Sequence, residues 1–217
     1  MAKERNSGVE LFRILATLLV LVVHLNGWMV GGIADSFDES TPVCIRIGQH
    51  VIWSLSLCCV NCFLVISGWF GVKLKFTTLY RLWILIVSVY VPFYIANVII
   101  TPHDFSIWFL LQSILVFPRE SYFVQNYIML LFLSPVLNSF IDKYNGQITK
   151  WVKALFIIEF TMESVFANKC LFIEKGYSLF HFVVMYMLGR VAFINKEKLL
   201  YVHSKYFITL FFCVLYY

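Results

Sequence analysis

Hydrophobic residues in this chain fall into long blocks that short polar stretches separate. Each complete block has about 18–22 residues, enough to cross the ~30 Å hydrocarbon core of a bilayer at about 1.5 Å per residue. The pattern therefore predicts an all-α fold, a polytopic transmembrane helix bundle with six full spans and a shortened seventh. The predicted spans cover residues 9–30, 47–68, 79–100, 123–141, 151–168 and 177–195, and the seventh begins near residue 206.

The block FSIWFLLQSILVF, residues 105–117, is apolar but only 13 residues long. That length is typical of an interfacial or re-entrant segment rather than a span. The basic residues favour this interpretation, because without a span here twelve of them lie on the N-terminal side of the membrane and four on the opposite side. Cytoplasmic loops carry the excess of lysine and arginine, so we expect a cytoplasmic N-terminus. A span at this block would nearly abolish the bias.

The composition argues against a water-soluble domain. Of the residues, 61% are hydrophobic and 13% are charged, whereas soluble domains have about 25% charged residues. The net charge is +5, but the basic residues lie in short loops rather than on one patch. The membrane charge rule explains them, so we expect membrane lipids as partners and no nucleic acid.

The chain contains one cysteine motif of the kind that binds metal ions, the C-x-x-C pair of Cys59 and Cys62. A zinc or redox site needs a second pair or nearby histidines, which this stretch lacks. We therefore expect no metal and interpret these cysteines as small buried residues of a membrane helix.

Two features concern the ends of the chain. Lys3 and Arg5 precede an apolar run that is longer than a signal-peptide core, so we expect a retained first transmembrane helix, capped by Ser7 and Glu10. The last block, residues 206–217, covers roughly 18 Å, too little to cross a bilayer. We therefore expect a chain truncated at its C-terminus.

Arg13 and His24 interrupt the first apolar block and are eleven residues apart. At 100° per residue they differ by about 20° from three full turns, so they share one helix face at roughly 16 Å separation. Ionisable residues within a membrane helix are candidates for function. The alternatives are a snorkelling arginine and a neutral imidazole bonded to another helix. The shared face favours a functional interpretation, in which Arg13 binds an anion that arrives from the cytoplasm and His24 acts as a base for a hydroxyl that arrives from the outer side.

Three stretches together resemble the bacterial membrane acyltransferase family 3, whose members O-acetylate lipopolysaccharide, capsule and exopolysaccharide sugars. FRILATLLVLVVH matches its R-x10-H signature, CFLVISGWFGVKLKF its F-F-x-x-S-G segment, and SYFVQNYIMLLFLSPVLN its aromatic-rich S-P segment. The chain departs from the pattern at Cys62, Trp69 and Tyr122. Family members have more spans, which implies that residues 1–217 form one integral membrane acyltransferase domain, incomplete at the C-terminus.

The resemblance implies an O-acyltransferase of the bacterial cytoplasmic membrane. It would move an acyl group, commonly acetyl, from cytoplasmic acyl-CoA to a hydroxyl of a cell-surface polysaccharide or lipid-linked sugar at the outer face. Acyl-CoA is then a co-substrate, and no cofactor is bound. By residue matching, His24 is the base or the transient acyl acceptor, and Arg13 binds the donor.

Further residues gain expected roles from the same resemblance, each with an alternative. Lys73, Lys75 and Arg81 are expected to bind the phosphates of the donor. The alternative is that these basic residues only fix the orientation of the chain in the membrane. Helix contact is the alternative for the small residues on the acceptor side, and an aromatic belt is the alternative for the tyrosines. The residues expected on the acceptor side are Ser67, Gly68, Tyr122, Gln125, Tyr127 and Glu163.

Glu159 and Glu163 lie one helical turn apart, and either can bind a cation, relay protons or stay protonated. Glu163 is nearer the outer end and is favoured for function. His181 and Arg190 repeat the polarity of the first helix and receive no role. A transporter or flippase for a glycan precursor, in which Arg13 and His24 line a substrate path, is the alternative function, and an inactive fragment is the third.

Overall fold

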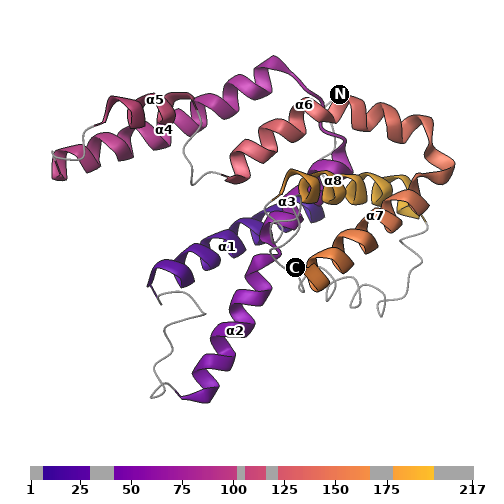
Figure 1. Ribbon diagram of the computed structural model, residues 1–217, viewed down its shortest axis with the longest axis horizontal. Coiled ribbons are helices and arrows are strands. Elements are labelled where there is room, and N and C mark those ends of the chain that lie inside the picture. Colours follow the sequence, from indigo (N-terminus) through magenta and orange to yellow (C-terminus); the bar gives the residue numbers. More distant parts are fainter. Residues whose placement is uncertain (1–6, 30–41, 102–105, 116–121, 167–177, 198–217) are drawn as a thin grey trace. The chain divides into compact units, whose positions relative to one another are not determined.

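A computed structural model describes residues 7–29, 42–101, 106–115, 122–166 and 178–197, and these residues are helical apart from short connections (Figure 1). The predicted all-α fold is confirmed for this part of the chain. The helices are α1 (Ser7–Met29), α2 (Val43–Leu57), α3 (Cys59–Phe70), α4 (Phe76–Ile100), α5 (Ile107–Leu115), α6 (Tyr122–Lys143), α7 (Asn145–Phe166) and α8 (Leu179–Ile194).

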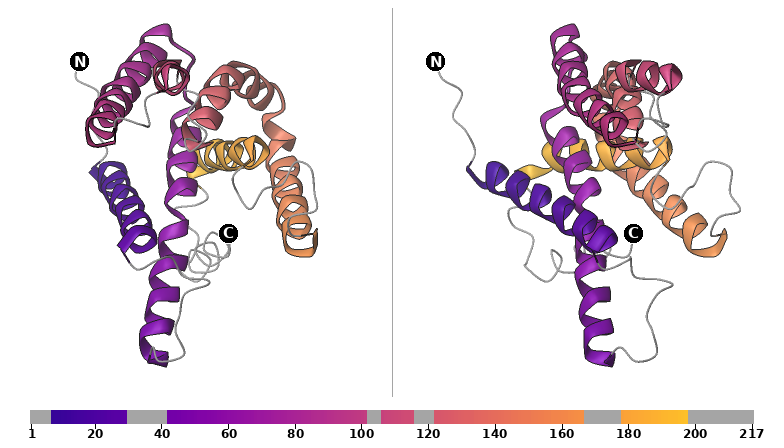
Figure 2. Two further views of the ribbon diagram at one scale, coloured as in Figure 1. Left: turned by 60° about the vertical axis from the view of Figure 1, so that its left-hand side comes forward. Right: turned by 90° about the vertical axis from the view of Figure 1, so that its left-hand side faces the viewer.

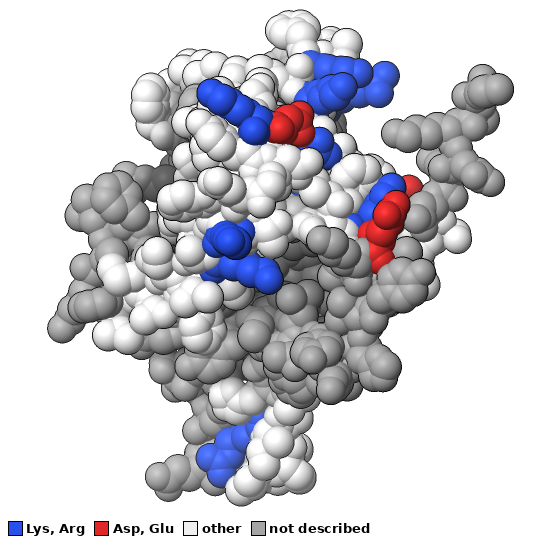
Figure 3. Space-filling model, turned by 90° about the vertical axis from the view of Figure 1, so that its right-hand side faces the viewer, with Lys and Arg blue, Asp and Glu red and all other residues white. Residues whose placement is uncertain are grey.

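Four helical segments are long and apolar enough to cross a membrane. They are residues 7–25 of α1, the α2–α3 segment Val43–Phe70, α4 and α6. Large apolar side chains such as Leu18, Ile84 and Val136 are exposed on them, and on the face that Figure 3 shows most of the described residues are uncharged. Exposed apolar surface of this extent suits lipid rather than water. These helices indicate a multi-pass membrane protein.

The predicted second span is longer than expected and is interrupted at Cys58. Immediately before the interruption, Ser56 Oγ donates to the Ile52 carbonyl (2.6 Å) and Cys58 Sγ to the Leu55 carbonyl (2.9 Å). Such bonds from a side chain to a preceding carbonyl compete with the helical ladder and bend helices. The sequence pattern shows only the continuous hydrophobicity, so it predicts one straight helix.

The short apolar block before residue 117 forms α5, a nine-residue helix that lies along α4 (Figure 1). Trp83 Nε1 donates to the Ile114 carbonyl at 2.9 Å, and the Tyr94 hydroxyl donates to the Ser106 carbonyl at 2.8 Å. The described part of this block is thus a short helix, as the sequence predicts. Its position at the outer face stays a prediction.

The chain divides into two compact units, Met1–Phe70 with Val184–Tyr217, and Gly71–Val183. In the first unit α1 lies against the α2–α3 segment (Figure 2). Ala16 is 1% exposed and packs against Cys58 and Cys62. These cysteines are therefore buried packing residues, as the sequence predicts, and the small side chains let α1 come close.

The second unit contains α4–α7 and the first turn of α8. Asn138 Nδ2 donates to the Val72 carbonyl (3.1 Å) and so ties α6 to the connection before α4. Tyr144 separates α6 from α7, and α7 begins at Asn145, six residues before the predicted span. The dipeptide Asn145-Gly146, which its sequence favours as a turn, therefore lies in the first turn of α7. Of the six extra residues only Ile148 is a large apolar residue, and one such residue does not extend a hydrophobic block.

Candidate functional site

Arg13 lies in the second turn of α1, and its side chain contacts two described residues. Its Nη1 is 3.1 Å from Glu10 Oε1, one turn earlier. Its Cζ is 5.2 Å from the centre of the Phe70 ring of α3. Glu10 therefore pairs with Arg13 at i,i+3, whereas the sequence predicted that its carboxylate would cap the helix together with Ser7, the first residue of α1.

The Arg13–Glu10 pair is partly open, with side chains 43% and 44% exposed. An apolar groove of about 290 Å³ lies beside it between α1 and α3. The lining residues are Gly8, Val9, Phe12, Val65, Ile66, Trp69 and Phe70. Phe70 both contacts Arg13 and lines the groove, so the Arg13 guanidinium lies at the edge of an apolar groove.

His24 lies on α1 eleven residues beyond Arg13, as expected, and its imidazole is exposed. Within the described residues no hydrogen bond or ion pair orients its ring. The helix between the two residues is uninterrupted, so the geometry of a single α-helix relates them.

Gly68 occupies a close crossing of α3 and α8 in the first unit. A Cβ on Gly68 would overlap the carbonyl oxygen of Tyr186, and a Cβ on Gly189 would overlap that of Val65. The backbones of the two helices are thus in direct contact. Helix contact is the alternative role that the sequence suggests for Gly68. Beside it, Ser67 Oγ donates to the Phe63 carbonyl of its own helix (2.8 Å). An acceptor-side role for either residue stays a prediction.

The other residues expected to bind the donor lie in the second unit. Lys73 and Lys75 are exposed in the connection before α4, and Arg81 is exposed in the second turn of α4. Long flexible cations of this kind can reach an anion in several directions. Their exposure agrees equally with phosphate binding and with a role in topology.

The aromatic and amide residues expected on the acceptor side form the first two turns of α6. Tyr122, Gln125 and Tyr127 are partly buried there. The Tyr127 ring stacks on Phe123, with centroids 5.8 Å apart, and Phe123 also contacts Phe182 of α8 at 5.6 Å. Tyr127 is therefore engaged in packing. The side chain of Glu163 lies outside the described part of the structure.

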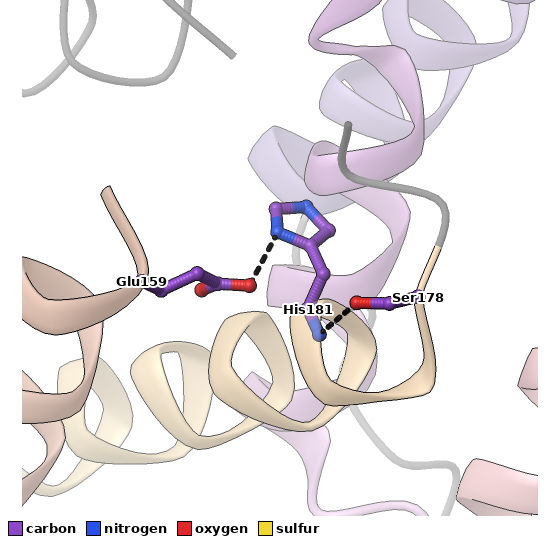
Figure 4. A network of polar contacts seen from close by, with 3 residues as sticks. All are labelled: Glu159, Ser178 and His181. Atoms are coloured by element: carbon purple, nitrogen blue, oxygen red, sulfur yellow. Dashed lines mark hydrogen bonds and ion pairs between the residues drawn. The ribbon is translucent and has the colours of Figure 1, made fainter. Parts of the chain in front are cut away.

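A buried contact between Glu159 and His181 in the second unit was not predicted from the sequence. His181 Nδ1 lies 3.1 Å from Glu159 Oε1, with side chains 2% and 1% exposed (Figure 4). The backbone N–H of His181 donates to Ser178 Oγ at 3.2 Å, so Ser178 caps α8. The other carboxylate oxygen, Glu159 Oε2, is buried and has no hydrogen-bond partner among the described residues.

The sequence contained part of the signal for this pair. Glu159 and Glu163 share a helix face, and His181 follows on the next apolar block. One-dimensional spacing cannot decide which carboxylate meets the histidine, and the preference for Glu163 overlooked the residue that the structure buries.

Among the described residues, no group of three or more His, Cys, Asp and Glu side chains could hold a metal ion. Comparisons with protein families, curated protein sequences and solved structures found no match to this chain. The fold thus defines a helical, multi-pass membrane protein, and the case for an activity comes from the residues described above.

Proposed function

We propose that this protein is an O-acyltransferase that moves an acyl group, most simply acetyl, from cytoplasmic acyl-CoA to a hydroxyl of a cell-surface polysaccharide or lipid-linked sugar. The observation that carries the proposal is the placement of Arg13 and His24 on one face of one uninterrupted apolar helix. The resemblance of three successive stretches to the acyltransferase family supports it.

The donor end of the proposed site is built around Arg13. Its ion pair with Glu10 is half-exposed, and such pairs contribute only about 0–1 kcal/mol. A phosphate that binds a guanidinium through two parallel hydrogen bonds is a stronger partner, so the donor would displace Glu10. The neighbouring groove is lined by apolar groups and suits the pantetheine arm or the acyl chain. Lys73, Lys75 and Arg81 would hold further phosphates.

The acceptor end is built around His24. In the transfer, the acceptor O–H bond breaks, its oxygen bonds to the acyl carbon, and the C–S bond to CoA breaks. His24 either takes the hydroxyl proton or first accepts the acyl group itself. Its exposed imidazole suits both roles. Tyr122, Gln125 and Tyr127 would bind the sugar together with Glu163. Ser67 and Gly68 precede Phe70 on α3, and because Phe70 contacts Arg13, they stand nearer the donor end.

The proposed topology has six full spans, with the N-terminus in the cytoplasm and residues 105–117 at the outer face of a bacterial cytoplasmic membrane. The distribution of lysine and arginine supports it. A reporter enzyme fused after Lys143 tests it, because the residue is then cytoplasmic. An extracytoplasmic reporter at this position would overturn the topology.

Transfer of labelled acetyl from acetyl-CoA to glycan, measured in membranes that contain the full chain, tests the activity. We expect His24→Ala to abolish transfer while the protein stays in the membrane. His50, exposed on α2, provides the control, and His50→Ala should transfer normally. Normal transfer by His24→Ala would refute the assigned chemistry.

A transporter or flippase for a glycan precursor is the second candidate, and the buried Glu159–His181 pair favours it. Buried carboxylates and histidines serve as proton relays in pumps and transporters. In that case Glu159→Gln would reduce export of the glycan, and acetylation of the exported glycan would not depend on His24.

A further inference from the structure

Two cations near the C-terminal end of α8 lie against an aromatic ring that packs on α3. Arg190 Cζ is 5.5 Å from the centre of the Phe193 ring, and Lys196 Nζ is 5.0 Å from the same centre. The Phe193 ring meets the Trp69 ring of α3 edge to face, with centroids 5.5 Å apart. Cations are attracted to the faces of aromatic rings, so Phe193 helps to fix where these two positive charges lie.

Trp69 connects these cations to the groove and to Arg13. Trp69 and Phe70 are neighbours on α3 and both line the apolar groove, and Phe70 contacts Arg13. Consecutive residues of a helix project about 100° apart. Arg13 therefore lies on one side of the end of α3, and Phe193 with its two cations lies on an adjacent side. All of these residues belong to the first compact unit.

Positive charge exceeds negative charge at this end of the first unit. The cations are Arg13, Arg190 and Lys196, and the described carboxylates of the unit are Glu10 and Glu197. Glu10 pairs with Arg13, whereas no ion pair joins Lys196 to Glu197 in the described part of the chain. A guanidinium has five N–H donors and an ammonium has three, so Arg190 and Lys196 can bind an anion in addition to their present contacts.

The cluster also agrees with the proposed topology. The start of α1, the end of α3 and the end of α8 meet through the contacts Arg13–Phe70 and Trp69–Phe193. With a cytoplasmic N-terminus and no span at residues 105–117, all three ends face the cytoplasm. A span at residues 105–117 would place the end of α8 on the opposite side from the end of α3. The cluster therefore lies on the side from which a cytoplasmic donor arrives.

Coenzyme A carries phosphate at two separate places. A diphosphate joins the pantetheine arm to the nucleotide, and a 3′-phosphate lies on the ribose, farther from the pantetheine. If the apolar groove takes the pantetheine arm, the diphosphate lies next to Arg13 at the edge of the groove. The 3′-phosphate then needs a second set of cations, and Arg190 and Lys196 lie beyond Trp69, where they can supply it.

We propose that Arg190 and Lys196 bind the 3′-phosphate of the acyl-CoA donor while Arg13 binds its diphosphate. This inference rests on the proposed function, and it gives a role to Arg190, which the sequence pattern left without one. The Arg190 guanidinium can bind two phosphate oxygens at once, and Lys196 adds a mobile point charge, a combination that suits a doubly charged phosphate.

Dephospho-CoA, which lacks only the 3′-phosphate, isolates this contact. The full chain in phosphatidylcholine nanodiscs is titrated with CoA and with dephospho-CoA, and the two dissociation constants are compared. The wild type should bind CoA roughly tenfold more tightly, as expected for charged hydrogen bonds to one phosphate. Lys196→Gln should reduce this preference, and Lys196→Gln combined with Arg190→Gln should abolish it. The affinity for dephospho-CoA should stay the same in both variants.

Two further variants show that the effect is local. Lys153→Gln removes the same charge from an exposed position on α7, in the second unit, and should keep the wild-type preference. Arg13→Gln should weaken both ligands equally, because both carry the diphosphate. Thermal unfolding in the same nanodiscs checks the fold of each variant. If the Arg190 variant unfolds, Lys196→Gln alone carries the test, because the Lys196 side chain is exposed.

Lipid headgroups offer the same phosphate chemistry, so the second arm of the experiment adds phosphatidylglycerol to the nanodiscs. If the two cations bind lipid, phosphatidylglycerol should raise the unfolding temperature of the wild type, and Lys196→Gln should remove the increase. That result, together with equal affinities for CoA and dephospho-CoA, would assign the cations to lipid and overturn the inference.

The outcomes separate this inference from the proposed function. A wild type that binds neither ligand would refute acyl-CoA as the donor, and the proposed function with it. A wild type that binds both ligands equally, or a folded Lys196→Gln protein that keeps the full preference, would refute only the 3′-phosphate site. Loss of the preference in Lys153→Gln as well would also refute it, because net charge rather than a local contact would then be responsible.

Discussion

The backbone of α3 at Gly68 meets the carbonyl group of Tyr186 on α8 without space for a side chain between them. The reverse contact, of Gly189 with the Val65 carbonyl, is equally tight. Helices in membranes associate largely through such close packing, because lipid removes the hydrophobic advantage of burying apolar groups. Gly68 and Gly189 therefore set the distance between these two helices.

Gly68→Ala and Gly189→Ala should each destabilise the protein, by about 1–3 kcal/mol as for overpacked cores. Thermal unfolding in detergent micelles measures the effect. The matched control is Gly48→Ala, because a Cβ on Gly48 meets nothing within 4 Å. The same change there should be neutral or stabilising by roughly 0.5–1 kcal/mol, since alanine favours helix over glycine. Equal effects at Gly48 and Gly68 would contradict the tight crossing.

Removing one member of the buried pair should be far more costly than removing both. Glu159→Ala removes the carboxylate that lies beside the buried His181 Nδ1, and breaking a buried pair costs about 3–5 kcal/mol. Glu159→Leu combined with His181→Leu removes both members of this contact and should unfold closer to the wild type than Glu159→Ala in the same measurement. A double variant as unstable as the sum of the single variants would show that the two side chains do not interact.

Glu10 should weaken donor binding, because its carboxylate occupies Arg13. Glu10→Gln removes this competition, which is worth up to about 1 kcal/mol for a half-exposed pair. We expect the KM for acetyl-CoA to fall about 2–5-fold. Arg13→Gln should raise this KM about 10-fold or more, as expected for loss of a charged hydrogen bond.

Salt provides the check on this prediction, because screening weakens exposed ion pairs. The advantage of Glu10→Gln should therefore shrink as ionic strength rises. The exposed Lys153 on α7 supplies a variant with the same change of charge as Arg13→Gln. If Lys153→Gln raises the KM as much as Arg13→Gln, net charge rather than a local contact controls donor binding.

Filling the groove between α1 and α3 should affect the donor and not the fold. Val9 lines the groove, and Val9→Phe adds volume that the open side accommodates. We expect a higher KM for acyl-CoA, with the larger increase for longer acyl chains, and an unchanged unfolding temperature. A KM that is independent of chain length and unchanged by Val9→Phe would exclude the groove from the donor site.

Hydrophobic patterning predicted the helices best where a helix is apolar along its whole length. The spans expected at residues 79–100 and 123–141 appear as α4 (Phe76–Ile100) and α6 (Tyr122–Lys143). The pattern did less well where polar chemistry decides the structure. The interruption at Cys58 depends on hydrogen bonds to preceding carbonyls, and the start of α7 is mostly polar.

The sequence likewise predicted one part of the candidate site and not the other. The spacing of Arg13 and His24 within one helix follows from helical geometry alone, and the structure keeps that helix intact. The partners of these residues do not follow from spacing. Glu10 could cap the helix or pair with Arg13, and Glu159 and Glu163 were equally able to face a histidine. Choosing between such options requires the packing of one helix on another.

The crossing at Gly68 also has a consequence for biosynthesis. The first unit combines Met1–Phe70 with Val184–Tyr217, so the ribosome makes the whole of Gly71–Val183 between its two parts. During that interval α3 has been made without α8, and the backbone at Gly68 lacks its partner helix. We therefore expect α3 to form its contact with α8 late, after the second unit has been synthesised, and a chain arrested before α8 to be a substrate for membrane quality control.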